Sequence, residues 1–241
     1  MKQVLTEGSN KERKIILMQS TIFILVLTLA GFAYPAKQIQ GKSWPTELNT
    51  AKNANYLEEL EQQVIHELNK VRSNPKRFAN EYLEELRTAY SGKLYTYPGQ
   101  DPVKSQEGIR PLEECIQVLQ QTDPMPLLNP AQGLAKAAND LAADQQKYGG
   151  IGHIARNGST PQKRIEKYGD WDHCSAEDIT YGSFEARQIV IALLIDDGVP
   201  DRGHRKNILN PCFRFAGVAN RTHPSYLSMC VIDYAGVYKT K

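Results

Sequence analysis

The spacing of apolar residues changes along this chain of 241 residues, and the change limits the folds that it can adopt. In several segments between residues 56 and 197, apolar side chains recur at three- and four-residue intervals, the spacing of amphipathic helices. From residue 213 onward two β-rich runs follow, FRFAGVAN and YLSMCVIDYAGVY, with RTHPS between them. The two runs predict an antiparallel hairpin. Helices followed by a short terminal sheet predict an α+β domain.

We expect four or five helices before the hairpin. The first starts near Tyr56, and the second follows Pro75, a residue that suits the first position of a helix. The other helical segments are residues 112–121, 128–150 and 183–198. The last of these is apolar nearly all round and should therefore be buried. The turn-rich stretch over residues 91–111 predicts a long exposed loop.

The N-terminus has the three-part pattern of a secretory signal. The apolar run Thr21 to Ala33 follows the charged KERK and ends in small residues, so we expect cleavage after residue 33 or 36. The alternative is a retained membrane anchor within residues 15–36, because this uncharged span reaches the roughly 20 residues that a bilayer needs. Both interpretations place the folded part outside the cytosol. We expect a signal or anchor over 1–36, a linker over 37–55 and a domain over 56–241.

The charge balance argues against binding to nucleic acids. The whole chain has 29 Lys and Arg and 27 Asp and Glu, and residues 1–36 hold four of the basic and two of the acidic side chains. The remainder therefore carries 25 of each and is formally neutral. Nucleic-acid binding proteins normally carry an excess of Lys and Arg for the phosphates.

The four cysteines allow two disulfides, as expected in an oxidising compartment, and three pairings are open. Cys212 and Cys230 fall on the two arms of the expected hairpin, a few residues away from direct opposition, so a bond between them is one candidate. Cys115 and Cys174 would then form the second disulfide. No C-x-x-C spacing indicates a zinc site or a redox motif.

Two of the five histidines, His153 and His204, each follow a glycine in a polar loop. Carboxylates lie between them in the sequence, at Glu177 and Asp178 and at Asp196 and Asp197. Two imidazoles and two or more carboxylates can form a metal site or an acid–base cluster. Alternatively, each histidine only caps a nearby backbone group. The chain has no H-E-x-x-H, G-x-S-x-G or P-loop motif.

A set of motifs in a fixed order resembles the CAP superfamily, which includes cysteine-rich secretory, antigen 5 and plant pathogenesis-related proteins. The chain is similar to that family, and to its bacterial members, over about residues 57–238. The motifs are VIHELNKVRSNPKRFA, PLLNPAQGLAKAANDLAADQ, GHI, AEDITYG, RGHRKNIL, FAGVAN and CVIDYAG. The resemblance implies a three-layer α-β-α sandwich with a small antiparallel sheet and a central cleft.

The resemblance also implies which residues line the cleft. His153 and His204 match the two cleft histidines, and Glu177 matches the glutamate of the family's Gly-Glu-Asn step, here Ala-Glu-Asp. The fourth, acidic position falls on Asp196 or Asp197, and we expect Asp197. The other two histidines considered, His66 and His223, are expected to be structural and solvated, respectively.

The predicted function is that of a secreted or cell-surface, non-enzymatic binding module. The resemblance implies a lipid or sterol, a glycan or a protein as the ligand, and zinc or another divalent ion held by His153 and His204. One alternative is a metal-dependent hydrolase in which Glu177 acts as general base on a metal-bound water. The other is a structural or adhesive envelope protein.

Overall fold

The computed structural model describes residues 43–96 and 102–241. The expected signal or anchor over 1–36 lies outside the described residues. The longer helices are α1 (Glu59–Ser73), α3 (Arg110–Gln121), α4 (Gln132–Tyr148), α5 (Pro161–Tyr168) and α6 (Ala186–Ile195). Shorter ones are η1 (Thr46–Leu48), α2 (Pro75–Phe78), η2 (Ala79–Leu83), η3 (Glu84–Ala89) and α7 (Gly203–Ile208). Within the described ranges, no helix has the length and apolarity to cross a membrane.

The main sheet has four strands in the order β4-β6-β7-β5. Its strands are β4 (Asn129–Pro130), β5 (Gly169–Tyr181), β6 (Phe215–His223) and β7 (Leu227–Thr240). The hairpin expected from the sequence is confirmed as β6 and β7, which pair antiparallel with Asn220 opposite Cys230. On the other side of β7 the long strand β5 pairs antiparallel, whereas β4 pairs parallel with β6. The sequence did not predict β5.

The expected exposed loop over residues 91–111 contains short strands. These are β1 (Tyr90–Ser91), β2 (Leu94–Tyr95) and β3 (Val103–Lys104), which form a separate three-stranded antiparallel sheet.

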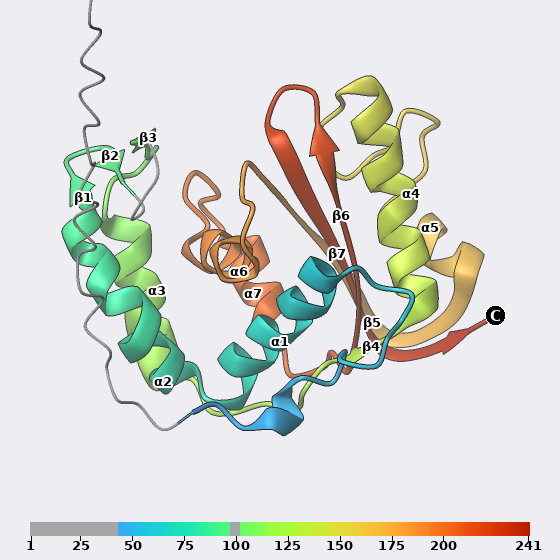
Figure 1. The fold of residues 1–241 in the computed structure, drawn as a ribbon, viewed down its shortest axis with the longest axis horizontal. Helices are drawn as coiled ribbons and strands as arrows, with labels where there is room; N and C mark the ends of the chain where they lie inside the picture. Colours follow the sequence, from blue (N-terminus) through green and yellow to red (C-terminus); the bar gives the residue numbers. More distant parts are fainter. Residues whose placement is uncertain (1–42, 97–101) are drawn as a thin grey trace, which may run out of the picture. The chain divides into compact units, whose positions relative to one another are not determined.

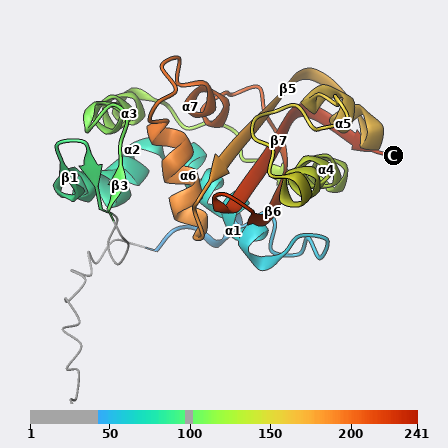
Figure 2. The same ribbon diagram turned by 90° about the horizontal axis from the view of Figure 1, so that it is seen from above.

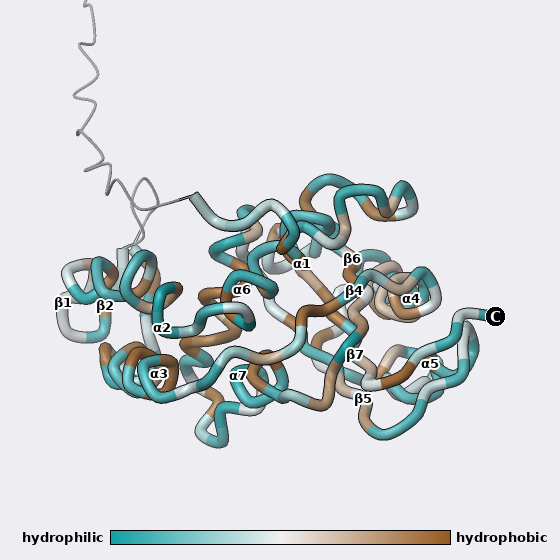
Figure 3. The backbone as a smooth tube through the Cα atoms, turned by 90° about the horizontal axis from the view of Figure 1, so that it is seen from below, coloured by the Kyte–Doolittle hydropathy of each residue, from teal (hydrophilic) through white to brown (hydrophobic). Residues whose placement is uncertain are grey.

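Helices cover both faces of the main sheet (Figures 1 and 2). Alternate residues of β7 face opposite layers, as the pleat requires. Ile232 and Tyr234 pack in the core that includes residues of α1, α3 and α6, whereas Met229 and Val231 pack beneath α4. Most apolar residues of α6, β6 and β7 are buried, and the tube in Figure 3 is coloured hydrophobic along parts of these elements. This arrangement confirms the three-layer α-β-α sandwich and the buried position of α6.

Close packing of α4 on the sheet depends on Gly217 in β6. A Cβ atom at this position would lie 2.0 Å from the amide nitrogen of Ala135 and 2.2 Å from the carbonyl carbon of Leu134. Any side chain there would push the helix off the strand.

The described part of the expected linker, residues 43–55, belongs to the folded domain. Leu48 and Ala51 are buried, and the Trp44 indole donates to Glu81 Oε2 at 2.8 Å. The amide of Asn69 in α1 donates to the Leu48 carbonyl at 3.0 Å. These contacts correct the boundary: the polar composition suggested a linker, but scattered apolar residues anchor the segment.

The disulfide pairing also differs from expectation. Cys174 is bonded to Cys212, and Cys115 and Cys230 are free and buried. Cys230 lies near the start of β7 opposite Asn220, whereas Cys212 precedes the other end of β6. A register shift between Asp172 and Ser175 in β5 brings Cys174 to the start of β6 instead. Because the sequence did not predict β5, it could not favour the Cys174–Cys212 bond over the other pairings.

Candidate functional site

His153 and His204 come together next to β5, the outer strand of the sheet. His153 lies in the loop after α4, which ends at Gly149 in the left-handed conformation (φ 71°). His204 lies in the first turn of α7. The centroids of the two imidazole rings are 6.5 Å apart. Segments that pack on opposite faces of the sheet therefore meet at one point.

Each histidine ring is held by a carboxylate. His153 Nδ1 donates to Glu177 Oε1 at 2.8 Å, and His204 Nδ1 donates to Asp196 Oδ1 at 2.6 Å. Such bonds fix the Nδ1–H tautomer and leave Nε2 as the remaining ring nitrogen. Among the described residues, neither Nε2 atom has a hydrogen-bond partner. The side chain of His153 is 45% exposed and that of His204 is 20% exposed, so a ligand can reach this pair.

Glu177 is itself buried and paired. Its second oxygen accepts a bond from the Arg164 guanidinium in α5 at 2.6 Å. The same guanidinium donates to the carbonyls of His153 and Ser159 at 3.1 and 2.8 Å. Arg164 therefore fixes both Glu177 and the loop that carries His153.

Asp196, rather than the expected Asp197, is the acidic partner of His204. Helix α6 ends at Ile195, and Asp196 follows in the left-handed conformation (φ 59°), which turns its carboxylate toward α7. Its Oδ2 also accepts the His204 backbone amide at 3.0 Å. Asp197 points away and accepts the amides of Gln106 and Glu107 at 2.7 and 2.9 Å.

The two arginines that flank His204 are structural. Arg202 donates to Glu107 and Glu114, and Arg205 donates to the carbonyls of Leu194, Ile195 and Pro111. These bonds fix α7 against α3 and the end of α6, and so fix the position of His204.

Two further carboxyl groups near the histidines, Asp178 and Asp233, are buried. The sequence indicated Asp178 as a carboxylate near the histidines but not as a cleft residue, and Asp233 was not predicted. Asp178 accepts a bond from the Asn207 side chain at 2.7 Å, and burial raises its pKa to about 7. Asp233 lies opposite Glu177 on β7, and neither of its oxygens has a hydrogen-bond partner within the described part of the chain. Burial and the charge of Glu177 raise the pKa of Asp233 well above its usual value. The sequence held one signal for Asp233, an acidic residue inside the apolar run CVIDYAG.

Burial opposes protonation of His204, but the bond to Asp196 and the charge of Asp178 act more strongly. The pKa of His204 is therefore raised above its usual value of 6.5. The site holds this ring more basic than a free imidazole.

His223, the last residue of β6, is structural and not solvated as expected. It is buried, and its Nε2 donates to the Gly150 carbonyl at 2.9 Å while Nδ1 accepts the amides of Ser225 and Tyr226. His66 in α1 is half-buried, and its Nε2 is buried without a hydrogen-bond partner among the described residues.

The histidine pair fits a divalent ion in part. Imidazole is a common zinc ligand, and a carboxylate on the other ring nitrogen is the usual outer support. Zn–N bonds of about 2.0–2.1 Å in tetrahedral geometry place two ring centroids roughly 5 Å apart. The rings would have to approach each other by about 1 Å. Over residues 43–96 and 102–241, no group of three His, Cys, Asp or Glu side chains is placed to hold a metal.

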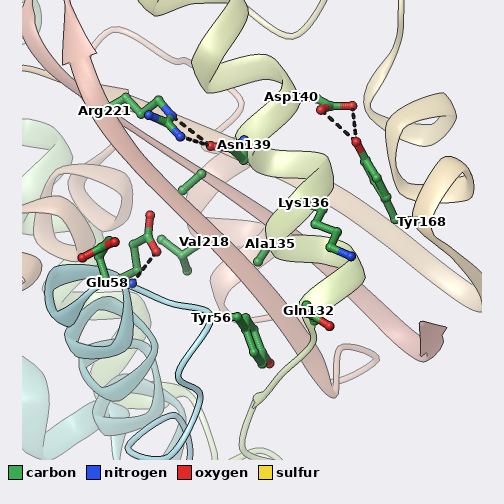
Figure 4. Close-up of a pocket in the computed structure, with 12 residues that line it drawn as sticks. Tyr56, Glu58, Gln132, Ala135, Lys136, Asn139, Asp140, Tyr168, Val218 and Arg221 are labelled. Atoms are coloured by element: carbon green, nitrogen blue, oxygen red, sulfur yellow. Dashed lines mark hydrogen bonds between the residues drawn. The ribbon is translucent and has the colours of Figure 1, made fainter. Parts of the chain in front are cut away.

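A separate cavity of about 330 Å³ lies between α1, α4 and β6, along the opposite edge of the sheet (Figure 4). Several of its polar groups bond to one another: Arg221 donates to Asn139, and the Tyr168 hydroxyl donates to Asp140. Neither His153 nor His204 lines it.

The fold and the site define an α-β-α sandwich domain with two histidine–carboxylate pairs. The family model described as CAP, the cysteine-rich secretory protein family, matches residues 65–234, and the chain belongs to this family. No curated protein matches the sequence.

Two solved structures resemble this one distantly. An outer surface protein from Borrelia burgdorferi is 20% identical, with a TM-score of 0.39 over 54% of this chain and 89% of that chain. An extracellular protein containing an SCP domain from Bacillus anthracis is also 20% identical, with a TM-score of 0.36 over 46% of this chain. The match spans about a third of the latter protein, 34% of its length.

Proposed function

We propose that this protein is an extracellular, non-enzymatic binding module whose ligand site is the His153–His204 pair, with a divalent ion such as zinc held by the two Nε2 atoms. The observation that carries the proposal is the paired geometry: two imidazoles 6.5 Å apart, each fixed through Nδ1 by a buried carboxylate. Two histidines leave positions on the ion for water or for an oxygen of the ligand.

An extracellular location is supported by the apolar N-terminal run and by the Cys174–Cys212 bond, because disulfides persist mainly in oxidising compartments. We propose binding rather than hydrolysis at this site. Catalytic zinc sites generally have three protein ligands, and Glu177, the expected general base, is already bonded to His153 and Arg164.

Zinc titration by isothermal calorimetry tests the proposal. We expect one zinc per chain, with binding at least about tenfold weaker in His153→Ala and in His204→Ala, because each removes one of two nitrogen ligands. The matched control is His173→Asn, which removes an exposed imidazole at a left-handed position (φ 71°) that asparagine tolerates. Zinc binding that survives both alanine variants, or no binding by the unmodified chain, would reject the metal site.

A further inference from the structure

Exposed apolar side chains gather at one end of the molecule. Twelve large apolar residues of the described part are exposed, and six of them lie on three segments: the end of α4 with the loop after it, the residues after β5, and the turn between β6 and β7. A random scatter of exposed apolar residues needs no explanation, but a concentration of this kind marks an interaction surface. We term these six residues the hairpin-end patch: Tyr148, Ile151, Ile154, Phe184, Tyr226 and Leu227.

The segments that carry the patch are bonded to one another. His223 Nε2, on the hairpin, donates to the carbonyl of Gly150 in the loop after α4 at 2.9 Å. The amide of Gly182, after β5, donates to the Ser228 carbonyl at 3.0 Å, and the Ser228 hydroxyl donates to the Ser183 carbonyl at 2.7 Å. Three segments distant in sequence are therefore held next to one another at the hairpin end.

A polar and aromatic network beneath the patch keeps its loops in place. The ring of Tyr181 lies 5.3 Å from that of His223 and 5.1 Å from that of Tyr226. Its hydroxyl donates to Gln145 Oε1 at 2.9 Å and accepts the Gly152 amide at 3.0 Å. The apolar side chains are thus presented by fixed loops.

Leu227 is the residue whose placement calls most for an explanation. Leu227 directly follows the three-residue turn 224–226. Its backbone is in the left-handed conformation (φ 68°), where glycine or asparagine is normally found. A bulky side chain is strained in this conformation, and this one is also 70% exposed to water. Asparagine would relieve both penalties, so the leucine suggests selection for an apolar contact.

Positive charge lies beside the patch. The Lys147 ammonium is 5.1 Å and the Arg156 guanidinium 4.3 Å from the centre of the Tyr148 ring. Aromatic rings with adjacent Lys and Arg are characteristic of the boundary between lipid headgroups and acyl chains. Cations near that boundary are attracted to anionic headgroups.

We propose that the hairpin-end patch docks this domain onto the surface of an anionic lipid bilayer. The exposed aliphatic and aromatic side chains enter the headgroup boundary, while Lys147 and Arg156 pair with phosphate or carboxylate groups. Loop tips that project apolar side chains suit a deformable lipid surface. This docking goes beyond the proposed ligand site and does not require the histidine pair.

The test uses the full chain with an environment-sensitive nitrobenzoxadiazole label at single positions, Leu227→Cys or Ile151→Cys. The free thiols Cys115 and Cys230 are buried and should not react. The control label replaces Val237, an exposed apolar residue outside the patch. Because the readout is local, an N-terminal anchor in the same chain does not mimic it.

With vesicles of phosphatidylcholine containing about 30% phosphatidylserine, we expect a blue shift and brighter emission at positions 227 and 151, and none at 237. Nitroxide-labelled lipids should quench the first two labels. Lys147→Glu combined with Arg156→Glu should remove the dependence on phosphatidylserine, whereas Lys163→Glu on α5 should not.

Unchanged emission at both patch positions would overturn the proposal, as would an equal shift at 237. The proposal would also be overturned if the emission shifted without vesicles, increasingly with protein concentration, and dimers appeared in analytical ultracentrifugation. The patch would then bind a second copy of the chain. Two label positions keep the test valid if either substitution alone disturbs folding.

Discussion

The histidine site and the hairpin-end patch share the loop after α4, but the first consists of paired polar side chains and the second of exposed apolar ones. At the histidine site His153 and His204 each have a carboxylate partner, and the buried Glu177 is bonded on both oxygens. In the patch the functional side chains are left in water, and the polar network lies beneath them. One short loop therefore contributes side chains to both regions. Hydrogen bonds fix its backbone, and its side chains contact different neighbours.

The largest effect is expected when the buried ion pair between Arg164 and Glu177 at the histidine site is removed. Arg164→Met leaves the buried Glu177 without its cation and next to Asp233. Breaking one partner of a buried pair costs about 3–5 kcal/mol, so we expect a loss of unfolding free energy of that order in urea denaturation. Lys163→Met, on the exposed face of the same helix, should change it by less than about 0.5 kcal/mol. Similar small losses in both variants would show that Arg164 does not support the site.

The second test asks whether the buried acid Asp178 makes the histidine side of the molecule sensitive to pH. Its folded pKa of about 7 lies above the usual 3.8, so between these values the folded state binds more protons than the unfolded state. The contribution of Asp178 to stability should be greatest below about pH 4 and fall as pH rises toward 7, by at most about 1.4 kcal/mol per pH unit. Asp233 acts in the same direction.

Asp178→Asn should therefore flatten the profile measured by thermal unfolding between pH 4 and 6, a range below the raised pKa of His204. Asp172→Asn, at an exposed position of the same strand, serves as the control. A slope that persists unchanged in Asp178→Asn would assign the pH dependence to other groups.

The smallest expected effect concerns Leu227 in the hairpin-end patch. Leu227→Asn should raise the unfolding free energy by about 1 kcal/mol, because asparagine tolerates the left-handed conformation better. Val103→Asn, another exposed apolar residue, should give no gain. A loss of stability in Leu227→Asn would mean that this side chain supports the folded domain, which would weaken the argument that it is kept for an external contact.

Elements with strong local patterns could be predicted from the sequence alone. The stripe of α1, the Gly149 end of α4, the apolar α6 and the β6–β7 hairpin follow from the spacing of apolar residues and from turn chemistry, which act over a few residues. The order of motifs was also enough to indicate the family and to select His153, Glu177 and His204.

Which side chains meet could be learned only from the folded structure. Strand β5 has a mixed polar sequence and becomes a strand by pairing with β7, and with it came the Cys174–Cys212 bond and the opposition of Glu177 and Asp233. Asp196, and not the expected Asp197, is the partner of His204 because Asp196 follows α6 in the left-handed conformation, which turns its carboxylate toward α7. Local patterns cannot specify such contacts, since they depend on where distant segments pack.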